Sequence, residues 1–387
     1  MTTRKTWRVA VLPGDGIGPE VIAQATRALD ALTEVEPDLA IDYDTFDWPS
    51  HAWHEAHGES APADYLARLA GYDAILLGAL GDPGPTTDPD RYLLSDSDSL
   101  APLLEIRKGF DQWVCERPVR RLEGAPQYLA DPRAADIDML VIRENSEGEY
   151  VNQGGRLAAG TPNEVVTQTA VFTHRATDRI IRHAFEQARA RAALRLSEGR
   201  ERQFGVDKHA SQVCLVTKRN AQKFWGDMYT EMFAAIAEDY PDVATHHELV
   251  DAACMKFVSH PWMFDVVAAS NLHGDILTDL AAVLNGGMGV SPSANLNPSD
   301  RSRPPMFEPT HGSAPDIAGQ NKAGPAAMLL TAAMMLDWMG EEDAVAARAG
   351  VRLRNAVAAD LAAHAGDARA TDAIGDAVLA ALREART

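Results

Sequence analysis

Short apolar runs alternate along the chain with longer segments in which apolar residues recur at helical spacing. The short runs predict strands, which lie at residues 7–16, 72–80, 136–145, 213–218 and 264–270. Amphipathic helices are predicted between them, for example at residues 18–34 and 175–194. Strands that alternate with helices indicate an α/β protein with a largely parallel sheet.

Two polar segments interrupt this alternation. Residues 81–90, rich in Gly, Pro and Asp, predict a loop directly after a buried strand. Residues 195–212 are charged and polar, and we expect them to form an exposed surface loop. The sequence contains no internal repeat, and its Ala-rich last third predicts ordinary helices.

Chain length and the length of the apolar runs limit which classes of protein are possible. A chain of 387 residues is long enough for two domains. No apolar run reaches the roughly 18–20 residues of a membrane span, so we expect no membrane association. The first residues do not resemble a secretory signal, which favours a cytoplasmic protein.

Cysteine content and charge narrow the class further. Cys115, Cys214 and Cys254 are widely spaced and form no C-x-x-C pattern, which argues against a disulfide framework or a zinc knuckle. The net charge of −20 argues against nucleic-acid binding. An anionic substrate would therefore need a local basic pocket.

The Gly-rich turn after the first strand suggests a dinucleotide-binding fingerprint. Gly14 and Gly16 fit G-x-G-x-x-G, but Pro19 occupies the third glycine position. Asp42 or Asp44 could serve as the ribose-binding acid of such a site. A tight strand-to-helix turn is the favoured interpretation.

A second segment, "HAWHEAH", suggests a metal site. His51, His54 and His57 do not have the H-E-x-x-H spacing that zinc proteases require on one helical face. A solvated surface segment is the favoured interpretation, and a zinc hydrolase remains a weak alternative.

The segment "SNLHGDILTDL" places two carboxylates on one helical face. Asp275 and Asp279 are four residues apart, so their side chains lie side by side and repel each other unless a cation lies between them. Oxygen ligands favour Mg²⁺ or Mn²⁺. The alternative is a helix cap at Asp275 with an exposed Asp279. Asp251 is a further acid within an apolar helical pattern.

Three arginines occur within or beside apolar segments. Arg107, Arg117 and Arg143 are each more typical of surface or ion-pair residues when taken singly. Together with a divalent cation, they would form a pocket that binds a small polycarboxylate through bidentate guanidinium groups.

Several long motifs in fixed order resemble one enzyme family. They are "LPGDGIGPEV", "LLEIRK", "ERPVR", "IRENSEGEY", "TKRN", "SNLHGDILTDL" and "EPTHGSAPDIAGQNKAGP". Over nearly its whole length the chain resembles the isocitrate/isopropylmalate dehydrogenase family of β-decarboxylating dehydrogenases. The segments "FDQWVCERPVR" and "SPSANLNP" resemble its tartrate/D-malate branch more than its isopropylmalate branch.

The resemblance implies an α/β fold that is not a Rossmann fold. Residues 1–112 and 286–387 would form a large discontinuous domain with the NAD-binding loop. Residues 113–285 would form a central domain with the dimer interface and the metal ligands. The active site would lie in the interdomain cleft of a homodimer, and each site would be completed by the neighbouring subunit.

The resemblance also implies roles for individual residues. Arg107, Arg117 and Arg143 would bind substrate carboxylates, with Lys218 as general base and Tyr150 as acid. Asp275 and Asp279 would ligate Mg²⁺ or Mn²⁺, and Asp251 would join them from the other subunit. Residues for NAD would be Glu308, His311, Gly312, Ser313, Ala314, Asp316 and Gly324. Without the resemblance, Lys218 would be interpreted as a surface lysine and Tyr150 as a core or hairpin tyrosine.

The implied reaction is oxidation of a small 2-hydroxy dicarboxylic acid, D-malate or tartrate, by NAD, followed by loss of CO₂. A monovalent cation such as K⁺ is a further cofactor that the resemblance suggests. An acidic residue at position 316 favours NAD over NADP, since it would repel a 2′-phosphate.

The chain departs from the family pattern at four positions. Glu116 stands beside Arg117 where an apolar residue is usual, which would alter the reach of that arginine. Gly324 replaces an Asn that contacts the adenine in relatives. Leu100 replaces the Glu that marks isopropylmalate enzymes, and Ala101 replaces the Ser of isocitrate enzymes. The last two changes disfavour those substrates without selecting one C4 acid.

Two other functions stay open at this stage. One is 3-isopropylmalate dehydrogenase, within the same family. The other is a non-catalytic relative that binds dicarboxylates without turnover, against which the intact Lys218, Tyr150 and three acids argue.

Overall fold

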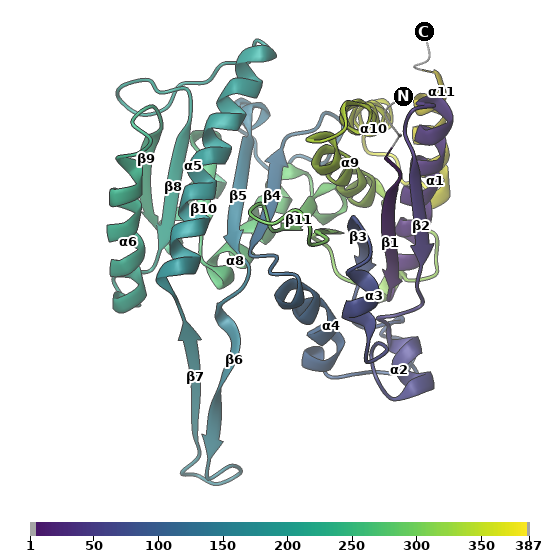
Figure 1. Ribbon diagram of the computed structural model, residues 1–387, viewed down its shortest axis with the longest axis horizontal. Helices are drawn as coiled ribbons and strands as arrows, with labels where there is room; N and C mark the ends of the chain where they lie inside the picture. Colours follow the sequence, from purple (N-terminus) through teal and green to yellow (C-terminus); the bar gives the residue numbers. More distant parts are fainter. Residues whose placement is uncertain (1–4, 385–387) are drawn as a thin grey trace. The chain divides into compact units, whose positions relative to one another are not determined.

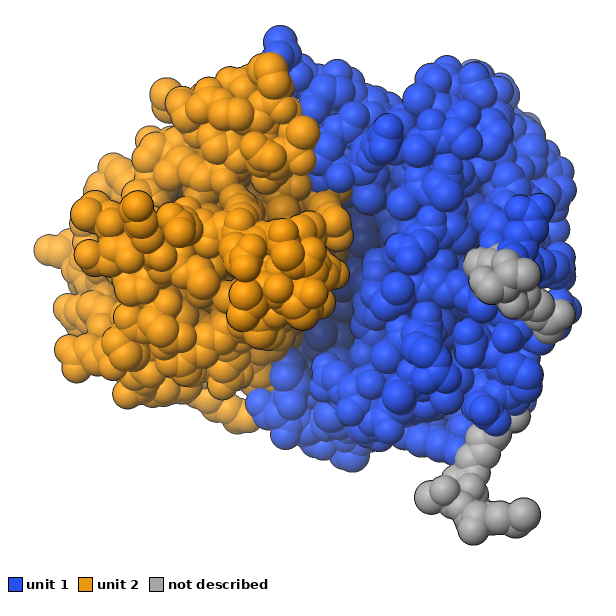
Figure 2. Space-filling view, turned by 90° about the horizontal axis from the view of Figure 1, so that it is seen from above, with its two compact units in different colours: residues 1–112, 121–130, 282–387 blue, residues 113–120, 131–281 orange. Residues whose placement is uncertain are grey.

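The computed structural model describes residues 5–384, which form two compact units (Figure 2). Within these residues the first unit comprises 5–112, 121–130 and 282–384, and the second comprises 113–120 and 131–281. In each unit helices pack against a sheet (Figure 1). The pattern of short apolar runs and amphipathic segments therefore predicted the α/β class correctly.

The sheet of the first unit combines strands from both ends of the chain. Its strand order is β2 (Ile41–Thr45), β1 (Trp7–Gly14), β3 (Ala74–Ala79), β12 (Met306–Pro309) and β11 (Pro292–Leu296). The strands pair in parallel except β11, which is antiparallel to β12. Every residue of β3 is buried, as expected of a parallel strand with both faces covered.

Helices of the first unit are α1 (Gly18–Val35), α2 (His51–His57), α3 (Tyr65–Leu69), α4 (Asp96–Gly109), α9 (Ala326–Gly340), α10 (Ala344–Ala363) and α11 (Thr371–Glu384). Helix α1 has Pro19 in its first turn, where a missing backbone N–H costs no hydrogen bond. The position that a nucleotide-binding motif would give to its third glycine is therefore the start of a helix. Helix α9 is buried on nearly all sides because α1 and α10 pack against it. Short 3₁₀ turns lie at Met288–Val290 and Pro315–Ile317.

The second unit has a sheet with the order β4 (Val114–Arg120), β5 (Asp138–Glu144), β10 (Val266–Ala269), β8 (Gln212–Thr217) and β9 (Ala244–Leu249). All pairs are parallel except β4 with β5. A separate antiparallel hairpin is formed by β6 (Gly148–Leu157) and β7 (Val165–Val171), which extends away from this sheet in Figure 1.

Helices α5 (His174–Ser197), α6 (Lys223–Ala237) and α7 (Val250–Ser259) pack on this sheet. Helix α8 (Asn271–Asn285) follows β10 directly, and short 3₁₀ turns lie at Pro132–Asp136 and Pro261–Met263. No helix within residues 5–384 is long and apolar enough to cross a membrane.

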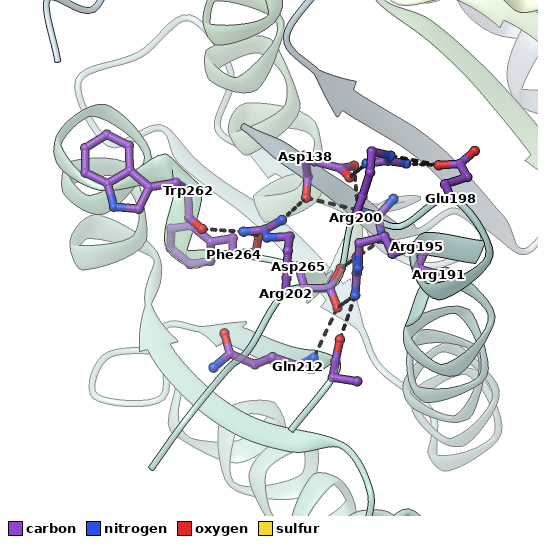
Figure 3. Close-up of polar contacts among 11 residues, drawn as sticks. Asp138, Arg191, Arg195, Glu198, Arg200, Arg202, Gln212, Trp262, Phe264 and Asp265 are labelled. Atoms are coloured by element: carbon purple, nitrogen blue, oxygen red, sulfur yellow. Dashed lines mark hydrogen bonds and ion pairs between the residues drawn. The ribbon is translucent and has the colours of Figure 1, made fainter. Parts of the chain in front are cut away.

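A buried group of acids and arginines lies at one end of this second sheet (Figure 3). Asp265 is fully buried just before β10, and its carboxylate accepts hydrogen bonds from Arg195 at 2.7 and 2.9 Å and from Arg191 at 3.0 Å. The Gln212 N–H adds a further bond at 3.2 Å. A buried carboxylate needs such partners because its loss of hydration is otherwise uncompensated.

The expectation of an exposed loop at residues 195–212 is therefore wrong in part. Arg195 still belongs to α5 and is only 2% exposed. Arg200 and Arg202 fold back so that their guanidinium groups reach Asp138, on its carboxylate and its main-chain oxygen respectively. The two buried acids attract this basic segment, a long-range requirement that local polarity does not reveal.

The Asp138 carboxylate generates a prediction for stability. Its burial alone would raise its pKa, but Arg191, Arg200 and Arg202 outweigh that effect and lower the pKa to about 2. The unfolded value is about 3.9, so ionised Asp138 stabilises the fold by about 2 kcal/mol above pH ~4, and this contribution disappears as the pH falls toward ~2. We expect Asp138→Asn to lower the free energy of unfolding in urea at pH 7 by about that amount or more.

The matched control is Asp131→Asn. Asp131 pairs with Arg133, which lowers the pKa of Asp131 to about 2 as well, but both side chains are exposed. Solvent screening should make the loss in this variant much smaller. Equal losses in the two variants would contradict the role assigned to burial at Asp138.

Candidate active site

The candidate site lies where β10 passes into α8 in the second unit. Parallel neighbours β5 and β8 end at the same edge of the sheet, since Ala269 of β10 is in register with Arg143 and Val216. In α/β proteins ligands bind at the carboxyl ends of such strands. The side chains in the first turns of α8 lie at this edge.

Arg143, near the end of β5, is the most buried cation of the site. It is 2% exposed, and its Nε and Nη2 donate to the Asn271 side-chain oxygen at 3.1 and 2.8 Å. Its Nη1 forms a short ion pair with Asp275. The guanidinium group is thereby held in one orientation with its charge directed toward α8.

The approach of α8 to Arg143 requires glycine at position 274. A Cβ at Gly274 would lie 2.7 Å from the Cγ of Arg143 and 2.8 Å from its Cβ. Neither atom lies at the far end of a flexible chain, so a larger residue would push the helix and the strand apart.

Arg117 reaches the same helix from β4. Its Nη1 donates to the Thr278 hydroxyl at 2.5 Å and to Asp275 at 3.5 Å. The same nitrogen lies 3.9 Å from a carboxylate oxygen of Asp279. Two guanidinium groups thus converge on Asp275 from neighbouring strands.

Tyr150 joins this group from the start of β6. Its hydroxyl donates to the second oxygen of Asp275 at 2.7 Å, and the Arg143 guanidinium lies 5.4 Å from its ring centre. The structure therefore places Tyr150 on a hairpin and also brings it to the predicted acids. The expectation of a hairpin tyrosine is therefore confirmed, and its role as an acid stays a prediction.

The surroundings of the second acid, Asp279, disfavour its charged form. Burial raises its pKa, and the nearby Asp275 carboxylate raises it further, while Arg117 and Arg143 act in the opposite direction. A divalent cation beside the two carboxylates would relieve this repulsion, and oxygen ligands of this kind fit Mg²⁺ or Mn²⁺. The donor set on α8 therefore fits the implied metal.

Asp251 and Lys218 form a separate pair in the same unit. Lys218 follows β8, Asp251 lies in the first turn of α7, and the ammonium and carboxylate are 2.7 Å apart. The Lys218 hydrogen bond lowers the pKa of Asp251. Within residues 5–384 no three His, Cys, Asp or Glu side chains cluster as a metal site. One chain therefore does not by itself bring Asp251 to Asp275 and Asp279.

His273, on the first turn of α8, lies close enough to Lys218 to sense its charge. Burial chiefly, and the Lys218 ammonium in addition, lower the pKa of His273 to about 4. The imidazole is therefore neutral near pH 7. It also lies against Trp225, with ring centres 5.5 Å apart.

Arg107 belongs to the first unit, where it pairs with a predicted cofactor residue. It is 7% exposed at the end of α4, and its Nη2 donates to Glu308 at 2.6 Å. Asn295 donates to the same Glu308 oxygen at 2.8 Å. The structure thus brings together Arg107, which was expected to bind substrate, and Glu308, which was expected to bind NAD.

The remaining predicted cofactor residues lie in the loop of residues 310–324, which we call the 310–324 loop. Its Ser313 carbonyl oxygen accepts the Ile17 N–H at 2.8 Å, and a Cβ at Gly16 would lie 2.1 Å from that oxygen. The Gly-rich turn after β1 therefore packs against this loop. Ala314 adopts a left-handed conformation with φ 42° immediately before the turn that carries Asp316.

Open space surrounds the glycines at the edges of the 310–324 loop. A Cβ at Gly312 or Gly324 would meet no atom within 4 Å. The Nε2 of His311 has no hydrogen-bond partner within the described part of the chain. An acceptor at Asp316, an unpaired imidazole nitrogen and accessible backbone are features that fit a dinucleotide.

Glu116 faces away from Arg117, so the expectation that it alters the reach of this arginine is wrong. Successive residues of a strand point to opposite faces, and the Glu116 carboxylate contacts the His183 ring nitrogen of α5 at 2.6 Å. His183 was not identified from the sequence, since it occurs in an ordinary amphipathic pattern.

The segment of His51, His54 and His57 is a helix rather than a uniformly solvated stretch. His51 is 2% exposed, and its backbone N–H and ring nitrogen contact Asp15 at 2.8 and 3.1 Å. The His54 ring contacts the Tyr92 hydroxyl, and His57 contacts the Trp53 carbonyl. The three rings have different partners, which argues against a shared zinc ion.

Two contributors to the site were missed in the sequence. Asn271 and Thr278 position Arg143 and Arg117, respectively, and both lie within the segment that drew attention to the acids. Their spacing of seven residues places them on the same side of α8, which was the available signal.

Comparison with known proteins identifies the family of this chain. The family model described as isocitrate/isopropylmalate dehydrogenase matches residues 8–383. D-malate dehydrogenase [decarboxylating] of Escherichia coli (strain K12) is 43% identical and covers 88% of this chain and 87% of its own. Tartrate dehydrogenase/decarboxylase of Pseudomonas putida is 42% identical, with coverages of 91% and 90%.

Relatives named for other substrates are nearly as similar to this chain. The 3-isopropylmalate dehydrogenase of Streptomyces griseus is 41% identical over 96% of both chains. Among solved structures, isocitrate dehydrogenase from Methylococcus capsulatus has a TM-score of 0.77 at 29% identity and covers 98% of this chain and 100% of its own. The chain therefore belongs to the isocitrate/isopropylmalate dehydrogenase family of β-decarboxylating dehydrogenases.

Proposed function

We propose that this protein oxidises D-malate or tartrate with NAD and a divalent cation, and that the keto acid formed then loses CO₂. The observation that carries the proposal is the convergence of Arg117, Arg143 and Tyr150 on Asp275. This chemistry needs two guanidinium groups, a hydroxyl that can donate a proton and a pair of carboxylates.

Arg117 and Arg143 bind the substrate carboxylates in this proposal. Both guanidinium groups are nearly buried, so a carboxylate that displaces their present partners meets strong, charge-assisted hydrogen bonds. Asn271 and Thr278 keep the two groups oriented during this exchange.

Asp275 and Asp279 hold the cation, together with Asp251 of a second subunit. The chemistry that such a cation supplies is Lewis-acid polarisation of the oxygen on C2. Tyr150 donates a proton to C3 after CO₂ has left, and its hydroxyl already lies 2.7 Å from Asp275.

Lys218 removes the proton from the C2 hydroxyl. Its Nζ lies 2.7 Å from the Asp251 carboxylate. General-base catalysis requires the neutral amine, so the proposal needs Asp251 to leave this pair when it acts as a metal ligand.

The 310–324 loop would hold the adenosine part of NAD, and the bound cofactor would supply the hydride acceptor. Asp316 supports the choice of NAD, since a carboxylate accepts hydrogen bonds from ribose hydroxyls but repels a 2′-phosphate. At an effective dielectric of about 20, one such charge pair at ~4 Å costs about 4 kcal/mol.

The C4 acids are preferred over the larger substrates on the basis of α4. Leu100 and Ala101 replace the Glu of isopropylmalate enzymes and the Ser of isocitrate enzymes. Relatives named for D-malate, tartrate and isopropylmalate are similarly identical to this chain, so 3-isopropylmalate dehydrogenase is the second candidate.

Exposed apolar side chains of the second unit support a homodimer. Several of them lie on the β6–β7 hairpin, α7 and α8, namely Leu157 at 70%, Val166 at 61%, Met255 at 72% and Ile276 at 52% exposed. The larger exposures of Val206 and Phe224 lie elsewhere in this unit. Apolar surface of this extent marks contact with another protein, and a second copy would cover the helices that carry Asp251 and Asp275.

The substrate can be tested with a panel of acids. We expect NAD reduction with D-malate or a tartrate at a kcat/KM at least about tenfold above that for isopropylmalate and isocitrate, in the presence of Mn²⁺. The measurement is absorbance of NADH with release of CO₂. A higher kcat/KM for isopropylmalate would select the second candidate instead.

The metal assignment can be tested with Asp279→Asn. Loss of one anionic ligand should lower kcat about 100-fold or more across a Mg²⁺ and Mn²⁺ titration, because the cation contributes several kcal/mol to the reaction. The circular dichroism spectrum should stay unchanged, since Asp279 is half-exposed and makes few contacts. Activity within about threefold of the parent would exclude Asp279 as a ligand.

Sharing of the site between subunits can be tested with Tyr150→Phe and Lys218→Ala. Each variant alone should be inactive, but a heterodimer would contain one intact site. Statistical mixing should therefore restore about one quarter of the parent activity. Heterodimers purified through two different tags that remain inactive would show that each chain uses its own Lys218.

A further inference from the structure

The loop of residues 81–94, between β3 and α4, contacts the 310–324 loop within the first unit. Its residues are exposed or half-buried, and residues 81–91 include no long apolar side chain, whereas the Tyr92 ring contacts those of His51 and His54. The order of residues 81–91 therefore depends on polar contacts.

Arg91 supplies most of these contacts. Its guanidinium donates to both oxygens of Asp82 at 2.9 and 3.1 Å, so the two ends of the loop are joined by a bidentate pair. Its Nη1 donates to the carbonyl of Asp88 at 2.7 Å and to that of Thr86 at 3.4 Å. These bonds hold the Thr86 backbone in place relative to Asp82, which lies just after the end of β3.

Thr86 then reaches across to Asp316, which lies 230 positions away in the chain. The Thr86 hydroxyl donates to Oδ1 of Asp316 at 2.6 Å, and the Thr86 N–H approaches the same oxygen at 3.4 Å. Within residues 5–384 no hydrogen bond or ion pair is formed by Oδ2 of Asp316. One carboxylate oxygen is therefore occupied, while the other can accept a bond from a ligand.

We propose that Thr86 is a positioning residue that sets the preference for NAD over a 2′-phosphorylated dinucleotide by fixing the Asp316 carboxylate. This inference rests on the proposed use of NAD and on the proposed contact between Asp316 and the ribose. Thr86 acts through Asp316 and does not itself need to touch the cofactor.

The physical reason is the freedom of an exposed aspartate. An unrestrained carboxylate rotates among several orientations and can turn away from a phosphate, which weakens both its attraction for a diol and its repulsion of an anion. Thr86 removes that freedom. The nearby Arg91 could otherwise attract a 2′-phosphate, but its guanidinium is engaged by Asp82 and by loop carbonyls.

The test compares Thr86→Val, Thr86→Ser and Thr87→Val. Valine retains the shape of threonine and removes the hydroxyl, whereas serine retains the hydroxyl. Thr87 is the adjacent exposed threonine, for which no side-chain hydrogen bond is found in the structure, so its variant controls for general effects on the loop. Dissociation constants of NADH and NADPH are measured by fluorescence titration without metal or substrate, together with kcat and KM for NAD and NADP.

We expect Thr86→Val to raise the dissociation constant of NADH and the KM for NAD about three- to tenfold, as loss of one exposed charge-assisted hydrogen bond does. The kcat with NAD should stay within about twofold, and NADPH binding should change little, so the preference for NAD falls by a similar factor. Thr86→Ser and Thr87→Val should resemble the parent. A role in loop stability alone would weaken NADH and NADPH equally.

The inference is overturned if Thr86→Val binds NADH as the parent does, or if Thr86→Val and Thr87→Val change the preference equally. The double variant Asp316→Lys/Ile317→Tyr separates this outcome from failure of the proposed function. If it shifts preference toward NADP while Thr86→Val has no effect, only the role of Thr86 is excluded. If it leaves the preference unchanged, Asp316 does not contact the ribose and both proposals fail.

Discussion

The contact between Arg143 and the first turns of α8 determines the geometry of the site. It exists because position 274 carries no Cβ, which lets the helix approach the arginine stem to a distance that any other residue would prevent. A glycine inside a helix costs about 1 kcal/mol relative to alanine. Loss of the Asp275 partner would remove the carboxylate that balances this buried charge, at a cost of about 3–5 kcal/mol, so the close approach is favourable overall.

The charges around α8 are balanced rather than uniformly positive. Arg117 and Arg143 face Asp275 and Asp279, and the whole chain carries a net charge of −20. A dianionic substrate would be repelled by the global field and would find no net positive charge in this group alone. In the proposed reaction, a divalent cation on the two acids would change that sign locally and leave the arginines available for carboxylates, which would couple metal binding to substrate binding.

Much of the fold and part of the candidate site could be predicted from the sequence. Strands β1, β3, β5, β8 and β10 and the α/β class follow from local periodicity. The pair of acids follows as well, because two carboxylates four residues apart are visible in any helical pattern. The burial of His51 on Asp15, the return of Arg200 and Arg202 to Asp138, and the bond from Thr86 to Asp316 join residues far apart in the chain. Glu116 was misassigned because adjacency in sequence was taken for adjacency in space, although a strand separates neighbours onto opposite faces.

Strand β10 connects two regions that look unrelated in the sequence. Asp265, just before it, is held by Arg191 and Arg195, and Asn271, just after it, holds Arg143. Four strand residues, Val266–Ala269, lie between these charged anchors and pair with β5 and β8 on both sides. We therefore expect the amide groups of β10 to exchange slowly with solvent, because an anchor at each end opposes fraying of this short strand.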